Sequence, residues 1–292
     1  MKVHVGEMST TIPVVGRVLN FLIRICLIPV TKYENCGFEM KIKSCKFVVT
    51  TLIWTFVPCT LAAYIYVPQI GDAFKQKTSI IASILVKIIS YTSIHVFLPF
   101  CMGYLVSTVK IPLQELVVPS QKIVIMLITL ADLTGGITAF ASQPNIISAE
   151  SVAAFIFTLF MTLTSSSALF IVNLFTTSLI SKCKKLSEIG QTGDFASECK
   201  SLLFVYRSVK KGFGPTLLYM FTVHVTLMVS LVYSLTVSDR FLYYFFPFIV
   251  EVLFILTLCL ICQECFDEFQ ATGDVIRWAY CSKKTSSSIG VA

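Results

Sequence analysis

Three ionisable side chains lie inside long apolar segments of the sequence: Lys87, Asp132 and Glu251. A charge within the hydrocarbon of a membrane is costly, so each of these side chains needs a polar partner or contact with a water-filled cavity. Two interpretations follow. Either the three side chains line or brace a polar cavity that binds a ligand, or they pair structurally and bind nothing.

Aromatic and hydroxyl side chains in the same apolar segments could complete a site for a small molecule. The segment RFLYYFFPF, residues 240–248, is dense in aromatic residues, and further phenylalanines lie between residues 152 and 180. Aromatic residues at the end of a span are most often an interfacial belt, but they can also form the wall of a ligand pocket. Besides the three charges, the candidate ligand-binding residues are therefore Ser83, Tyr91, Thr138, Phe157, Phe160, Tyr243 and Tyr244.

Cys259, Cys262 and Cys265 form a C-x-x-C-x-x-C run, a spacing that can ligate a metal or a cluster. A complete site would need a fourth ligand nearby, and none stands out. Acylation at a membrane border, or chance in a cysteine-rich helix, explains the run better. His95 and His224 are isolated and are expected to be packing residues. The sequence has no GxSxG, HExxH, P-loop or GxGxxG element, so we expect no enzyme, metal site or cofactor.

The composition indicates an integral membrane protein. Hydrophobic residues make up 55% of the 292 residues and charged residues only 13%, and the mean hydropathy is +0.82. A soluble domain carries about a quarter charged residues and could not bury this much apolar surface. The net charge of +7 lies beside the apolar segments, where it sets topology, so nucleic acid is not an expected partner. The 11 cysteines imply no disulfide framework.

Six apolar segments would position the candidate residues, and each can cross a hydrocarbon core of ~30 Å. They cover residues 47–67, 79–109, 123–141, 152–180, 215–237 and 241–262. The predicted fold is an all-α transmembrane helical bundle. The third segment is the weakest, because it contains Asp132 and two glycines, and the alternative for it is a re-entrant or interfacial segment.

Lysine and arginine are distributed unevenly over the connecting segments, which predicts the orientation. With the N-terminus inside, the inner segments carry 19 of them and the outer segments 3, so the positive-inside rule places both termini in the cytoplasm. The predicted organisation is a cytoplasmic amphipathic segment at 1–46, spans at 47–180, a cytoplasmic anchor region at 181–214, spans at 215–262, and a cytoplasmic helix and tail at 263–292. Residues 12–30 would lie on the membrane surface as an amphipathic helix.

The cytoplasmic loop at 181–211 has a helical pattern in its second half. From Ser197 onward apolar residues recur on one side, and no strong break separates this pattern from the fifth apolar segment. We expect a helix that projects into the cytoplasm and continues into that segment. A solvated basic connector is the alternative.

The stretch LFVYRSVKKGFGPTLLYMFTVHVTLMVSLVYSL, residues 203–235, resembles the end of a long cytoplasmic loop in insect gustatory and odorant receptors. In that family a basic helix leads into an N-x-x-F-G/S-x-x-L-L turn and then a span. Phe213 and Gly214 match this turn, while Lys210 stands at about the place of the usual Asn. The stretch CFDEFQATGDVIRWAY, residues 265–280, is similar to the helix after the sixth span of these receptors, and Pro29 matches a proline that precedes their first span.

This resemblance implies a ligand-gated, nonselective cation channel in the plasma membrane, assembled as a homo- or hetero-tetramer of related subunits and detecting a small tastant or odorant. The ligand would bind among spans two, three, four and six. The resemblance assigns the assembly anchor to Tyr206, Phe213, Gly214 and Trp278. The family's seventh, pore-lining helix has no counterpart here, because the last 14 residues are polar and small. We therefore expect a gustatory-receptor-like chemosensory subunit that is truncated before the pore helix, or non-conducting and co-assembled with related subunits.

A small-solute transporter with six spans, or a membrane scaffold protein, is the alternative function. Inverted repeats would support a transporter, but residues 47–141 and 152–262 show no clear similarity. The predicted topology argues against a G-protein-coupled receptor, which has an outside N-terminus and seven spans.

Overall fold

The computed structural model describes residues 14–289, except residues 26 and 110 and the segments 33–37, 74–77, 112–114, 142–147, 190–194 and 238–240. The described chain is almost entirely helical, which confirms the predicted all-α fold. Its helices are α1 (Val14–Arg24), α2 (Cys45–Thr50), the π-helix η1 (Thr51–Phe56), α3 (Val57–Ala73), α4 (Thr78–Thr108), α5 (Lys122–Ala141), α6 (Ala149–Ile189), α7 (Phe195–Val237) and α8 (Phe241–Ile289). A short antiparallel pair, β1 (Thr31–Lys32) and β2 (Phe38–Glu39), follows α1.

The N-terminal helix α1 packs onto the bundle. Its sequence is amphipathic, with Arg17 and Arg24 exposed and Leu19 fully buried. Directly after α1, the backbone carbonyl of Ile25 accepts a hydrogen bond of 3.0 Å from Nε1 of Trp54 in η1. The predicted amphipathic pattern is therefore present, and the described residues bury the apolar face of α1 against protein.

Two glycines allow elements of the bundle to approach closely. A Cβ at Gly103 of α4 would lie 2.9 Å from Cγ of Pro29 and 3.0 Å from Sδ of Met40. A Cβ at Gly136 of α5 would lie 2.6 Å from Cγ2 of Thr158 in α6. Small residues at such contacts let backbones pack closely, which is a common feature of helix packing in membranes.

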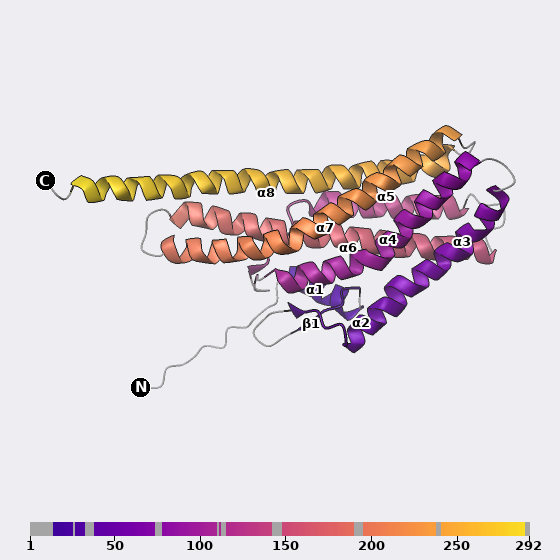
Figure 1. Cartoon of the computed structure of the whole chain (residues 1–292), viewed down its shortest axis with the longest axis horizontal. Coiled ribbons are helices and arrows are strands. Elements are labelled where there is room, and N and C mark those ends of the chain that lie inside the picture. Colours follow the sequence, from indigo (N-terminus) through magenta and orange to yellow (C-terminus); the bar gives the residue numbers. More distant parts are fainter. Residues whose placement is uncertain are drawn as a thin grey trace.

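The helices α6, α7 and α8 are far longer than the ~20 residues that cross a bilayer, with 41, 43 and 49 residues. They contact one another and project together past α3, α4 and α5 (Figure 1). α7 runs from the segment that the sequence analysis placed in a loop, from Phe195 onward, into the fifth apolar segment without interruption, as its sequence pattern predicted. The last part of α8 extends beyond the ends of α6 and α7 (Figure 1).

The outward-facing side chains of the bundle are largely apolar, as lipid contact requires. Exposed large apolar side chains include Leu52, Phe56, Ile89, Phe97, Met126, Leu130, Leu218, Val229, Leu256 and Leu260. Within the described residues, five helices are long and apolar enough to cross a membrane: Cys45–Pro68, Ile84–Thr108, Ala149–Glu188, Phe195–Thr236 and Tyr244–Arg277. The third predicted span corresponds to α5, which is not among these five, so the count of six spans is not confirmed.

Candidate functional site

A lysine from α4 contacts an aromatic ring from α8 inside the bundle. Lys87 is 7% exposed, and its Nζ lies 4.0 Å from the ring centroid of Tyr244. An ammonium over the face of a ring is attracted by the negative potential of that face, and the attraction strengthens when water is excluded. The structure thereby brings together two of the predicted ligand-binding residues, Lys87 from the apolar segment at 79–109 and Tyr244 from the apolar segment at 241–262.

Aromatic rings from α3 and α6 pack against the face of α4 that carries Lys87, Tyr91 and His95. Tyr91, one helical turn after Lys87, packs edge-on against Phe157 at a centroid distance of 5.7 Å and stacks with Tyr66 at 6.1 Å. His95, a further turn along, lies 5.3 Å from Phe157. The structure thus joins the predicted residues Tyr91 and Phe157 with Tyr66 and His95, which the sequence did not single out for ligand binding. We call Tyr66, Lys87, Tyr91, His95, Phe157, Phe160 and Tyr244 the aromatic–lysine cluster.

Phe160, also a member of the aromatic–lysine cluster, connects it to Trp54 of η1. Phe160 lies 5.1 Å from Trp54 and 6.4 Å from His95, both measured between ring centroids. His95 is completely buried, and neither of its ring nitrogens has a hydrogen-bond partner among the described residues. Buried polar atoms normally have a partner, so these two nitrogens are the polar atoms of the cluster whose hydrogen bonding the described residues leave unmet.

A second group of polar side chains lies where α5, α6, α7 and α8 meet. Nδ1 of His224 lies 2.7 Å from Oε2 of Glu251, and both residues are buried. Oγ1 of Thr162 donates a hydrogen bond of 2.6 Å to Oδ2 of Asp132. Asp132 also interacts electrostatically with Glu251 and His224. We call these four residues the acid–histidine cluster.

The structure gives each of the three predicted intramembrane charges a different partner. Lys87 contacts the Tyr244 ring, and Glu251 pairs with a histidine that the sequence analysis treated as a packing residue. That expectation for His224 was wrong. The signal that could have revealed the pair is position: His224 lies 13 residues before the end of α7 and Glu251 lies 10 residues after the start of α8. In an antiparallel helical hairpin such positions lie within about one helical turn of the same depth.

Other predicted ligand-binding residues lie apart from these clusters or outside the described residues. Thr138 is exposed, and its Oγ1 donates a hydrogen bond of 2.9 Å to the backbone carbonyl of Thr134 in its own helix. The side chains of Ser83 and Tyr243 lie outside the described residues. The cysteine run forms no metal-binding group, since no cluster of three or more His, Cys, Asp or Glu ligands occurs in the part of the chain that the structure describes.

The predicted anchor residues lie on or near the long parts of α7 and α8. The ring centroids of Tyr206 in α7 and Phe269 in α8 are 4.7 Å apart, so these helices contact each other beyond the apolar segments. Phe213 is buried, and nothing lies within 4 Å of a Cβ placed at Gly214. The side chain of Trp278 lies outside the described residues.

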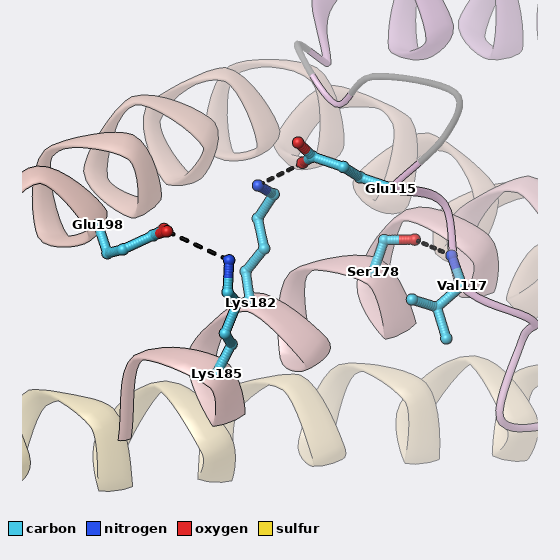
Figure 2. A network of polar contacts seen from close by, with 6 residues as sticks. All are labelled: Glu115, Val117, Ser178, Lys182, Lys185 and Glu198. Carbon is cyan, nitrogen blue, oxygen red and sulfur yellow. Dashed lines mark hydrogen bonds and ion pairs between the residues drawn. The ribbon is translucent and has the colours of Figure 1, made fainter. Parts of the chain in front are cut away.

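A polar cleft of about 450 Å³ lies between α6, the start of α7 and the segment that follows α4. Figure 2 shows Lys182 and Lys185 of α6 reaching Glu115 and Glu198, with ion-pair distances of 2.5 and 3.2 Å. Oγ of Ser178 accepts a hydrogen bond of 3.0 Å from the backbone N–H of Val117. Both lysines are paired with carboxylates, so these contacts fasten α6 to its neighbours and do not leave a free cationic site.

Together, the long apolar helices, the lipid-compatible outer faces and the buried charges define a polytopic α-helical membrane protein. No protein-family model and no curated protein sequence matches this chain. The family resemblance of the sequence therefore remains a prediction.

Replacing Tyr244 with leucine is expected to destabilise the protein by about 1–2 kcal/mol, because the buried Lys87 ammonium loses the ring face that it contacts. Tyr244→Phe keeps a ring at this position and is the matched control. The free energy of unfolding in lipid bicelles would be measured for both variants. Equal losses for phenylalanine and leucine would show that the lysine–ring contact does not contribute.

Proposed function

We propose that the chain is a chemosensory receptor subunit of the insect gustatory receptor type, which responds to a small tastant and contributes to a ligand-gated, nonselective cation channel. The observation that carries the proposal is the aromatic–lysine cluster, in which α3, α4, α6 and α8 bring rings and one buried ammonium together. Mostly apolar surroundings with a few convergent polar groups are typical of small-molecule sites.

The proposal includes six membrane spans, with α5 as the third. α5 has 20 residues, which at 1.5 Å per residue reach about 30 Å, the thickness of a hydrocarbon core. Its outward face carries exposed apolar side chains: Ile123, Met126, Leu127, Leu130 and Ile137. This face is suited to contact with lipid. With α5 counted as a sixth span, the connecting segments rich in lysine and arginine all lie on one side of the membrane, as the positive-inside rule requires. The N-terminus is then cytoplasmic and the protein resides in the plasma membrane.

The proposal also includes assembly with related subunits into a tetramer through the projecting parts of α7 and α8. This region carries exposed apolar side chains at Leu203, Phe204 and Tyr206 of α7 and at Phe266 and Ile276 of α8. Outside a membrane, exposed apolar patches commonly mark protein–protein contacts. The Tyr206–Phe269 contact holds the two helices together, so that they would present these side chains as one surface.

The test is current recording from cells that express the chain alone and together with related receptor subunits, against a panel of tastants. We expect a tastant-evoked cation current, with Lys87→Met raising the half-maximal concentration about tenfold, equivalent to about 1.4 kcal/mol of binding free energy. Lys185→Met, in the polar cleft, is the matched control and should leave the concentration unchanged. Surface-expressed protein that gives no current with any subunit would contradict the proposal.

A small-solute transporter is the second candidate, and the acid–histidine cluster is the observation that favours it. Ionisable side chains inside spans mark substrate, ion or proton pathways in many transporters. Uptake of labelled solutes by the same cells separates the two candidates. Uptake without current would support the transporter, and current without uptake would support the receptor.

A further inference from the structure

The acid–histidine cluster holds more ionisable groups than its surroundings can neutralise. With both carboxylates ionised and the imidazole neutral, Asp132, His224 and Glu251 would carry two negative charges inside an apolar bundle. No lysine or arginine among the described residues contacts the cluster, and α6 contributes only the hydroxyl of Thr162. Uncompensated charge in such surroundings is costly, and the group neutralises by binding a proton instead.

The neighbouring elements do not supply the missing positive charge. α4 packs against α7, and its two ionisable side chains at this end of the bundle are engaged elsewhere. Lys87 is held over the Tyr244 ring, two helical turns along α8 from Glu251, and His95 lies among the rings of the aromatic–lysine cluster. Protons bound by the cluster itself can supply the balance.

The geometry identifies an atom that can accept one. An ionised Glu251 can only accept a hydrogen bond, so the hydrogen of a neutral His224 ring lies on Nδ1, which faces Oε2 at 2.7 Å. Nε2 then carries a free lone pair. It is buried and has no hydrogen-bond partner among the described residues. The ring of Phe254 stacks on His224 at a centroid distance of 3.8 Å, and a ring face stabilises the imidazolium that forms when Nε2 is protonated.

We propose that the acid–histidine cluster is a proton-binding site that ties α5 to α7 and α8. One proton on His224 makes its contact with Glu251 an ion pair, and a second on the free oxygen of Asp132 removes the remaining charge while Thr162 keeps its hydrogen bond. Loss of the protons leaves two carboxylates that repel each other across the contact of α5 with α8. This inference does not depend on whether the protein is a receptor or a transporter.

Infrared difference spectroscopy of the full chain in lipid nanodiscs tests the site directly. Exposed carboxyl groups are ionised above about pH 6, so a protonated-carboxyl signal that persists there reports a shielded site. We expect this signal in the unmodified protein and its loss in Asp132→Asn, because the proposed state protonates Asp132 and leaves Glu251 ionised in its pair with His224. Glu150→Gln, which changes an exposed carboxylate at the start of α6, should retain it. The absence of the signal in the unmodified protein, or its persistence in Asp132→Asn, would overturn the proposal.

Two further measurements test the same site. If the folded protein holds protons that the unfolded chain releases, these protons make its stability fall as the pH rises between about 6 and 9. Other buried groups also titrate, so the pH dependence is compared with that of Asp132→Asn, which cannot bind the carboxyl proton. The same pH dependence in both proteins would contradict the proposal. At fixed pH, exchanging potassium for sodium should leave the infrared signal unchanged, and its loss on adding sodium would assign the cluster to a metal cation in place of a proton.

Discussion

Replacing Glu251 with leucine is expected to destabilise the folded protein by about 1–3 kcal/mol, because it leaves the buried His224 ring without its hydrogen-bond partner. An unpartnered polar group inside the bundle loses the full benefit of solvation, while the leucine gains only apolar contacts. The free energy of unfolding, measured in bicelles at a fixed pH, would report the loss.

The double variant His224→Leu with Glu251→Leu is the matched control for this prediction. Replacing both members of a buried polar pair with apolar residues is often neutral, whereas removing one member is costly. We therefore expect the double variant to recover most of the stability that Glu251→Leu loses. A double variant as unstable as the sum of the two single variants would show that the pair contributes no coupling energy.

Replacing Gly103 with alanine is expected to destabilise the protein by about 1–2 kcal/mol. The added methyl group would lie 2.9 Å from the Pro29 ring, which cannot rotate away, so α4 and the segment after α1 must separate. Overpacking of this kind costs about 1–3 kcal/mol, and the better helix propensity of alanine offsets up to about 1 kcal/mol of that cost. Thermal unfolding of the purified protein provides the measurement.

Gly273→Ala supplies the comparison, since nothing lies within 4 Å of a Cβ at this position of α8. Here the propensity gain acts alone, so the variant should be more stable by about 0.5–1 kcal/mol. Changes of the same sign in both variants would mean that the close contact at Gly103 does not limit packing.

The helices could be predicted from the sequence because apolar segments of this length have no alternative structure in a membrane. The continuous helix α7 could also be predicted, since no strong break separates the helical pattern that begins at Ser197 from the fifth apolar segment. The number of spans could not be settled in this way. α5 is apolar but carries Asp132, and the groups that accompany this carboxylate come from α6, α7 and α8, which the local sequence does not contain.

The candidate residues were harder to predict than the helices that carry them. Tyr91 and Phe157 were identified by residue type, and the structure places them in contact. Tyr66, His95 and Trp54 were missed as contributors, because each resembles an ordinary packing residue until the rotation of its helix about its own axis is known. That rotation is set by packing between helices, which hydropathy does not report.

Because α8 is one continuous helix, a small change in its direction at Glu251 would displace residues far along it. No proline follows Pro247 in this helix, which runs on to Ile289. At 1.5 Å per residue the section beyond Glu251 measures about 57 Å, so a tilt of about 5° at Glu251 moves its far end by about 5 Å. If α8 tilts as one rod, it would act as a lever arm, and a change of a few degrees near one carboxylate would displace its far end by about the rise of one helical turn.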